Sequence, residues 1–359
     1  MYKSYWPAFA AMLLLLSPAA HAASEIYGVG HVSLDVVGND DPDPANEDRS
    51  FSLTSGHSYL GLRGREVLQN QMAVLWQAEN TVDFDAGGWG PGRDTFAGLE
   101  TRFGSLLIGK HATPYRMTTE DLDVFADTRA DYSAVIGSID GLSLFNNRAD
   151  NALLYMTPRD KRLRFMLAYS TRVTGEDDLP LSTDESRQDA WSTALEFVSG
   201  PLYMGFAYES LGELMGPGLD DGKAKKFGLG WETGSGTRMS FIWEDARTGE
   251  TSGGEQVGRA AYYLSLAHVQ GNLTWKIAYG LADALDSVED SGAHFLALGG
   301  NYALSARTEL YLLYTAVMNE DAGNYGLQPD HDGTGAVAAA GDTTDAFSVG
   351  IVHRFSFEF

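Results

Sequence analysis

The densest group of side chains able to attract ions lies between His111 and Phe145. Thr118-Thr119-Glu120-Asp121, followed by Leu122 and Phe125, is typical of the start of a short helix with an apolar i, i+3 pair. Residues four apart share a helix face, so such a helix would present Asp123 and Asp127 together. The segment has a net charge of −4, with acids at Glu120, Asp121, Asp123, Asp127, Asp131 and Asp140 and bases at Arg116 and Arg129. This pattern favours a segment that attracts cations.

The residues that most often carry catalysis are absent or poorly spaced. The chain has no cysteine, which excludes cysteine nucleophiles and cysteine zinc sites. The histidines are scattered singly, without the spacing of zinc ligands. Gly56-His57-Ser58-Tyr59-Leu60-Gly61 comes close to the nucleophile elbow of hydrolases, but it has one residue too many and opens a strand. We therefore expect no enzyme activity, no catalytic residue, no cofactor and no metal site.

Composition excludes further classes. The formal net charge is −24, from 25 Lys and Arg against 49 Asp and Glu, so nucleic acid is not an expected partner, because phosphate binding requires a basic face. A hydrophobic content of 44% and an aromatic content of 11% argue against disorder. The acidic excess fits an ordered protein whose surface attracts cations.

Residues 1–22 have the features of a secretory leader. Lys3 supplies a positive charge, an apolar run spans Ala8 to Leu16, and Ala22 follows as a small residue at the expected cleavage point. The run is shorter than the roughly 20 residues that a transmembrane helix needs. Cleavage after Ala22 would leave a mature chain of residues 23–359. No later segment is long and apolar enough for such a helix, so a membrane-spanning form would have to be a closed barrel.

Apolar and polar residues alternate through most of the mature sequence in segments of about ten residues. In 347–359, for example, Phe347, Val349 and Ile351 share one face and Ser348 and Gly350 the other. In a soluble β-sandwich the apolar face would be buried in a core, whereas in a membrane barrel it would meet lipid. Alternation alone leaves both open.

Two further features favour the barrel. Very short connections, such as Ser199-Gly200-Pro201 and Gly234-Ser235-Gly236, alternate with long polar or acidic loops near 38–50, 111–145, 173–189, 211–222, 248–256, 282–292 and 319–342. This asymmetry is typical of outer-membrane barrels, with turns on the periplasmic side and loops outside. The last strand also ends on aromatic Phe359. Counting segments predicts an all-β, 16-stranded antiparallel transmembrane barrel spanning 23–359.

With these segments in order, the chain resembles the general Gram-negative porin family. The similar stretches are residues 25–28, Leu60-Gly61-Leu62-Arg63-Gly64-Arg65-Glu66, residues 73–79, Arg93-Asp94-Thr95-Phe96-Ala97-Gly98-Leu99, residues 103–110, Asn147-Arg148-Ala149-Asp150-Asn151 and residues 302–311. The resemblance covers essentially the whole mature chain. It implies a homotrimer of outer-membrane barrels, each with a pore for small hydrophilic solutes and ions that is narrowed by an inward-folded third loop. Outer-membrane lipid, lipopolysaccharide and the barrel insertion machinery are the other implied partners.

The resemblance also implies which residues line the constriction. They are Glu120, Asp121, Asp123, Asp127 and Asp131 of the third loop, His111 to about Phe145, and Arg63, Arg93 and Arg148 of the facing wall. Where the family carries a further basic residue at the start of the second strand, Tyr59 stands here. We therefore expect a thin basic wall and a preference for cations.

Some alternatives remain open at this point. A substrate-specific channel would have the same strand pattern, and a surface β-sandwich adhesin would share the alternation. The acidic loops can be solvated surface or can bind divalent cations that bridge to lipopolysaccharide, as for Asp40, Asp41, Asp43, Glu47 and Asp48.

Overall fold

The computed structural model describes residues 22–40, 48–174, 189–213, 221–250, 256–327 and 339–359, and the expected leader and the acids Asp41, Asp43 and Glu47 lie outside these ranges. The first strands are β1 (Ala22–Asp40), β2 (Asp48–Ser55), β3 (Tyr59–Val67), β4 (Ala73–Asp83), β5 (Gly88–Gly92), β6 (Thr95–Thr101), β7 (Gly104–Ala112), β8 (Ser138–Ile139), β9 (Leu142–Ser143) and β10 (Arg148–Met156). The later strands are β11 (Leu163–Thr174), β12 (Ala190–Ser199), β13 (Leu202–Leu211), β14 (Gly222–Glu232), β15 (Thr237–Glu250), β16 (Gln256–Gln270), β17 (Leu273–Ala282), β18 (Ala293–Ala303), β19 (Thr308–Asn319) and β20 (Thr343–Glu358). Helical segments are short: η1 (Gln69–Gln71), α1 (Pro114–Met117), η2 (Glu120–Leu122) and η3 (Tyr132–Ala134).

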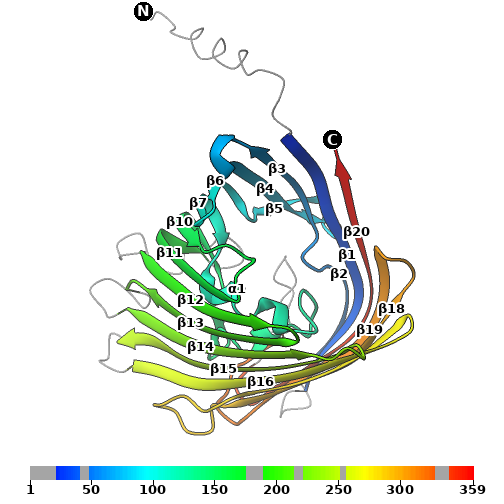
Figure 1. The fold of residues 1–359 in the computed structure, drawn as a ribbon. Helices are drawn as coiled ribbons and strands as arrows, with labels where there is room; N and C mark the ends of the chain where they lie inside the picture. Colours follow the sequence, from blue (N-terminus) through cyan, green and yellow to red (C-terminus); the bar gives the residue numbers. More distant parts are fainter. Residues whose placement is uncertain (1–21, 41–47, 175–188, 214–220, 251–255, 328–338) are drawn as a thin grey trace, which may run out of the picture.

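Eighteen of these strands form one antiparallel sheet that closes on itself, because β1 pairs with β20 from Glu25↔Glu358 to Asp40↔Thr343. Two strands of the barrel are each interrupted once. β2 and β3 both pair with β1, and β5 and β6 both pair with β4. Counting each interrupted strand once confirms the predicted 16-stranded barrel. Its strands lie side by side around one axis (Figure 1).

The sheet sorts its side chains by the predicted period of two. On β20, Phe347, Val349 and Ile351 are exposed on the outer face, while Ala346 and Ser348 are buried on the inner face. A closed sheet with an apolar exterior satisfies every ladder hydrogen bond within itself, which hydrocarbon requires. Within the described ranges, no helix has the length and apolarity to cross a membrane.

The short connections lie at one end of the barrel. Ser199 pairs with Leu202 and Gln270 pairs with Leu273, so each of these hairpins turns through two residues. The turn glycines Gly200 and Gly271 have φ of 57° and 63°, the left-handed conformation that such tight turns require. Both chain ends of the barrel wall, the start of β1 and the end of β20, lie side by side (Figure 1).

The third loop, expected from His111 to about Phe145, spans residues 113–147 between β7 and β10 and lies inside the barrel (Figure 1). Its apolar residues Leu122, Phe125 and Val135 join one buried cluster with Tyr263 and Phe295 of the wall. These contacts bury apolar surface between loop and wall, which holds the loop in the lumen.

The predicted helix from Thr118 is wrong in position. The helical turn α1 ends before it, capped by the Thr113 side chain, which accepts a hydrogen bond from the Arg116 amide. A 3₁₀ turn follows at η2, and Asp123 is extended, with φ −80° and ψ 120°. The Asp123 carboxylate accepts hydrogen bonds from the amides of Phe125 and Tyr132, which competes with helix continuation. Asp123 and Asp127 therefore do not share a helix face.

Candidate pore constriction

A dry ionic network anchors the base of the third loop to β15 and β16. Glu244 accepts hydrogen bonds from the Tyr115 hydroxyl (2.6 Å) and the Gly137 amide (2.7 Å). It also pairs at 2.9 Å with Arg259, and both side chains are fully buried. Arg259 in turn donates to the carbonyls of Val135 and Ser138. A buried ion pair whose remaining atoms are bonded to the loop fixes that loop against the wall.

The far end of the loop is anchored to the opposite side of the barrel. Arg129 is almost fully buried and donates through Nε to Asp35 of β1 at 3.0 Å. Its Nη2 donates to Thr54 of β2 at 3.0 Å. Since the loop is bonded to β15 and β16 at one end and to β1 and β2 at the other, it crosses the lumen.

Asp123 is one of these structural groups. Besides the two amides, its carboxylate accepts a hydrogen bond from Tyr263 of β16 at 2.5 Å, and its side chain is buried. Burial, reinforced by the nearby Asp131, raises the pKa of Asp123 to about 7. The carboxyl therefore faces the wall and not the water-filled part of the lumen.

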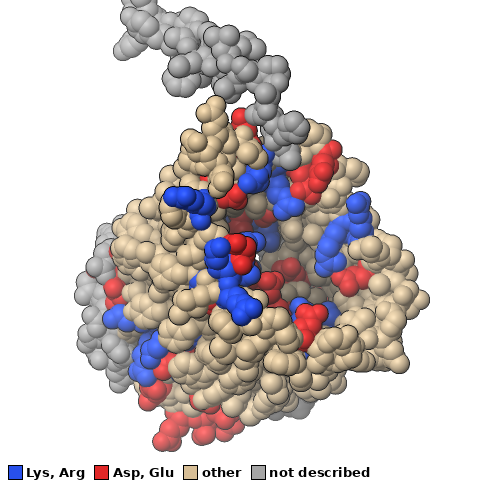
Figure 2. Space-filling view, viewed as in Figure 1, with Lys and Arg blue, Asp and Glu red and all other residues tan. Residues whose placement is uncertain are grey.

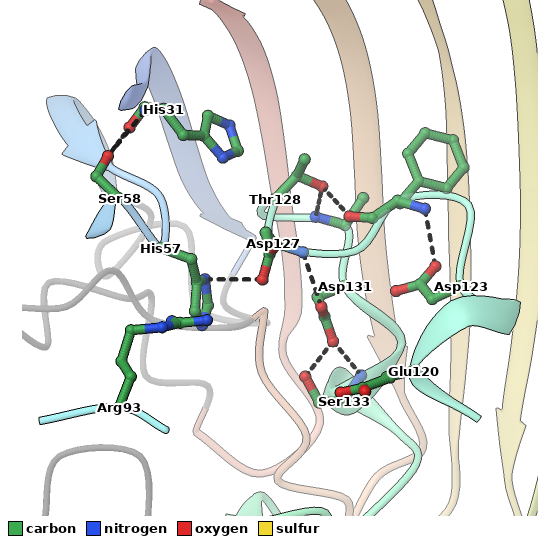
Figure 3. Close-up of polar contacts among 12 residues, drawn as sticks. His31, His57, Ser58, Arg93, Glu120, Asp123, Asp127, Thr128, Asp131 and Ser133 are labelled. Carbon is green, nitrogen blue, oxygen red and sulfur yellow. Dashed lines mark hydrogen bonds and ion pairs between the residues drawn. The ribbon is translucent and has the colours of Figure 1, made fainter. Parts of the chain in front are cut away.

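Six of the eight residues expected at the constriction line one cavity of about 200 Å³. They are Glu120, Asp121, Asp127 and Asp131 on the loop side and Arg93 and Arg148 on the wall side. Figure 3 shows Asp127 at the loop tip, Asp131 behind it, and Arg93 on the facing wall. Asp131 accepts hydrogen bonds from the amides of Asp127 and Ser133 at 3.0 and 2.9 Å, so it also shapes the tip.

The facing wall is irregular where its polar groups emerge. His57 lies in the break between β2 and β3 and has φ 48°. Arg93 lies in the break between β5 and β6, and Arg148 begins β10 just before a register shift between Ala149 and Ala152. Breaks and bulges re-aim side chains, and here they direct three basic groups to the same level of the lumen.

Both sides of the cavity are charged, but their exposure differs. The side chains of Glu120 and Asp127 are 43% and 52% exposed, and Asp121 is also exposed. The side chains of Arg93 and Arg148 are 13% and 14% exposed. Each of the two arginines has a carboxylate partner, Glu79 at 3.7 Å and Asp94 at 2.9 Å respectively. The charge that meets water is therefore mainly acidic.

Although the Glu120 side chain is partly exposed, the surrounding protein of the narrow lumen desolvates its carboxyl and raises its pKa, against the opposing effect of Arg116 and Arg148. Burial likewise raises the pKa of Asp131, against the hydrogen bonds from Ser133. These two carboxyls therefore take up protons at a higher pH than free ones would.

Arg63, the remaining expected residue, lies outside this cavity. Its Nε donates to Glu25 at 2.6 Å and its guanidinium stacks on the ring of Tyr27, 4.5 Å from the centroid. Tyr59, which stands where the family carries a further base, lies under Arg93 at 4.7 Å from its ring centroid. The tyrosine thus supports an arginine that the chain does have.

Two basic lining residues were not among those expected at the constriction. Arg116 pairs with Glu120 at 3.5 Å. The two residues are four apart in the sequence, so a helix predicted to start at Pro114 would have placed them on one face. His57 lies 3.7 Å from Asp127, measured from Nδ1 to Oδ1. Its position depends on the interruption of the strand, for which the alternation pattern holds no signal.

Two more cavities border the loop. One of about 380 Å³ shares Glu120 and Asp121 with the first, and one of about 180 Å³ shares His57, Ala126 and Asp127 with it. In the space-filling view, basic and acidic side chains surround a hollow in the middle of the molecule (Figure 2). Within the part of the chain that the structure describes, no group of three or more His, Asp or Glu side chains is arranged to hold a metal ion.

A closed barrel with an apolar outer face, a polar hollow and a charged gap between loop and wall defines a channel-forming protein of the outer membrane. The Gram-negative porin family model matches residues 8–322, and the chain belongs to that family. This confirms the resemblance, the outer-membrane location and the function as a porin channel. The fold and the family are those of channels and not of enzymes.

The chain is similar to outer membrane porin protein 32 of Delftia acidovorans, with 26% identity over 96% of this chain and 97% of that protein. A shorter match joins it to major outer membrane protein P.IB of Neisseria sicca, at 33% identity over 22% of each chain. Among solved structures, an anion-selective porin from Comamonas acidovorans superposes with a TM-score of 0.75 and 23% identity, covering 93% of this chain and 100% of that one. An outer membrane protein of Vibrio cholerae in trimer form superposes with a TM-score of 0.65 and 16% identity, covering 93% of this chain and 99% of that one.

Proposed function

We propose that this porin is a channel for passive diffusion of small hydrophilic solutes and ions, and that it prefers cations. The observation that carries the preference is the difference in exposure across the constriction. Glu120, Asp121 and Asp127 face water, whereas Arg93 and Arg148 are recessed and each has its own carboxylate partner. In a narrow low-dielectric passage the accessible charges dominate the field that an ion experiences.

The similarity to an anion-selective porin does not determine the sign here. At 23% identity the two chains share the fold, while selectivity depends on a few side chains in the lumen. In this chain the cavity lining has four carboxylates against three arginines, since Arg116 lines it together with Arg93 and Arg148. Their balance supports cation preference at neutral pH.

The test is the reversal potential of the purified protein in a planar bilayer under a KCl gradient. We expect an ohmic current that small sugars do not block, and a reversal potential of the sign that K⁺ permeation produces. The preference should fade at high salt, because the Debye length falls from about 30 Å at 0.01 M to about 3 Å at 1 M. A potential of the opposite sign would overturn the selectivity proposal, and block of the current by one solute at low concentration would favour a substrate-specific channel.

We also propose that the chain assembles as a homotrimer. The support is the trimer form of the Vibrio cholerae relative and the outer face of β1, where Leu34 and Val36 are exposed. On this face a Cβ at Gly30 would make only an ordinary van der Waals contact, with Phe84 at 3.8 Å, whereas at Gly28 it would lie 2.5 Å from the Tyr59 carbonyl oxygen and 2.7 Å from the ring of Phe355. Gly30→Trp therefore adds bulk only outside the barrel and should shift unheated gels toward monomer. An unchanged trimer band would remove this face from the interface.

Secretion through a leader cleaved after Ala22, contact with lipopolysaccharide and recognition by the barrel insertion machinery remain predictions from the sequence. N-terminal sequencing of the protein from outer membranes would test the cleavage point directly. A chain beginning at Ala23 is the expected result.

A further inference from the structure

We propose that His57 is a specificity-determining residue of the channel, whose protonation neutralises the loop tip and weakens cation preference in mild acid. The inference rests on the proposed cation preference and adds a residue that sets its pH dependence. The His57 side chain lies between two cavities of the lumen and lines both.

His57 and Asp127 approach each other across the gap between wall and loop. Nδ1 and Oδ1 are 3.7 Å apart, and the two side chains are 29% and 52% exposed (Figure 3). Both residues, together with Ala126, border the 200 Å³ and the 180 Å³ cavities. An ion that passes between loop tip and wall therefore passes this pair.

Both residues are held in a backbone conformation that few side chains adopt. His57 has φ 48° and Asp127 has φ 63°. Asp and His are among the residues that tolerate positive φ best. The break in the strand places the imidazole, and the amide of Asp127 is bonded to Asp131 at 3.0 Å, which holds the tip in position. The two groups are thus fixed opposite each other by their own segments.

The charge of His57 is large relative to the net charge of the groups around it. The first cavity is lined, besides His57, by the charged or titratable residues Asp127, Asp131, Glu120, Asp121, Arg116 and Tyr132 of the loop and Arg93 and Arg148 of the wall. The second is lined by His57 and Asp127 together with His31, Tyr59, Lys276, Glu309, Tyr311 and Arg354. Positive and negative groups are nearly balanced in this set, so one added proton changes the net charge by a large fraction. Imidazole titrates in the range between about pH 5 and pH 8, unlike the arginines and lysine around it.

The consequence follows from simple charge balance. While the imidazole of His57 is neutral, Asp127 is a water-facing carboxylate that attracts cations. Once the imidazole is protonated, the imidazolium pairs with Asp127 and cancels that charge at the narrow point. Removing one accessible carboxylate should lower the K⁺ to Cl⁻ permeability ratio by about twofold.

The experiment measures reversal potentials under a KCl gradient from about pH 7.5 to about pH 5.5, where imidazole titrates. The variants are His57→Asn, which tolerates positive φ and carries no charge, His57→Gln as a second neutral form, and His57→Lys, which stays charged. The matched control is His353→Asn, because His353 lies on β20 with its ring bonded to Thr308 and outside the three cavities.

We expect the permeability ratio of the wild type and of His353→Asn to fall in acid, and that of the neutral His57 variants to fall much less. The residual change in those variants comes from Glu120 and other carboxyls. His57→Lys should show the acid value already at about pH 7.5. Wild-type pH dependence in both neutral variants would overturn the proposal. This outcome is separable from failure of the proposed cation preference, which is read from the sign of the wild-type potential at neutral pH.

Discussion

The two walls that face each other across the third loop differ in how they use charge. Strands β12 to β18, the regular wall, run without interruption and have one register shift, between Arg247 and Glu250 near the end of β15, and their buried polar groups, such as Glu244 and Arg259, bond the loop. Strands β2 to β10, the irregular wall, are interrupted twice and have two register shifts, and their polar groups line the open cavity. The regular wall therefore holds the loop in place, while the irregular wall and the loop together carry the charges that the lumen presents to ions.

The largest effect is expected from breaking the regular wall's anchor. Glu244→Ala leaves Arg259 buried without its carboxylate, which costs on the order of 3 to 5 kcal/mol. The loop should leave the wall, with larger and noisier single-channel conductance and a lower temperature of barrel unfolding in detergent. The control is Glu100→Ala, whose partner Arg65 is exposed and whose pair is worth roughly 1 kcal/mol or less. Wild-type conductance in Glu244→Ala would show that the loop does not depend on this anchor.

A smaller effect is expected from the irregular wall. Arg148→Gln removes one recessed cation and leaves Asp94 unpaired, so the K⁺ to Cl⁻ permeability ratio should rise by about twofold. Arg247→Gln is a suitable control, because Arg247 pairs with Asp286 in an exposed position outside the cavities. A ratio unchanged in both variants would mean that the recessed arginines contribute nothing to selectivity.

The smallest effect concerns the pH dependence of loop docking. Burial raises the pKa of Asp123 to about 7 from an ordinary value of 3.8, so the docked loop holds a proton that the undocked loop loses. Docking is therefore strongest below about pH 4 and weakens as pH rises toward about 7. Hydrogen exchange of the Phe125 and Tyr132 amides, corrected for intrinsic rates, should show falling protection over this range. Asp123→Asn should flatten the profile, and equal slopes in both proteins would contradict the assignment.

The regular wall was predictable from the sequence. Alternation over ten-residue segments places Trp275 and Ile277 on lipid and Ala278 inside, as the structure has them. The strand count followed from the short turns, because a two-residue hairpin such as Ser199–Leu202 leaves few alternatives for the register. Here local pattern and global fold agree.

The breaks in the irregular wall, and which acidic side chains are buried, were not predictable from the sequence pattern. Alternation assigns Glu244 to the inner face but does not show whether an inner side chain is buried under the loop or faces the water-filled lumen. Nothing in the local sequence shows that Asp123 turns to Tyr263, since that contact joins segments 140 residues apart. The break that brings His57 to the loop tip is likewise a tertiary feature, because a strand of the same composition could run through without interruption.

We propose that the water-facing carboxylates of the loop outweigh the recessed arginines in setting ion selectivity. The most direct test is the reversal potential under a KCl gradient at neutral pH for Asp121→Asn with Asp127→Asn, compared with Asp160→Asn with Glu289→Gln, an equal charge change at exposed positions outside the cavities. We predict cation preference in the wild type and in the control pair, and a shift toward anions in the loop pair. An anion-preferring wild type, or equal shifts in the two pairs, would contradict the account.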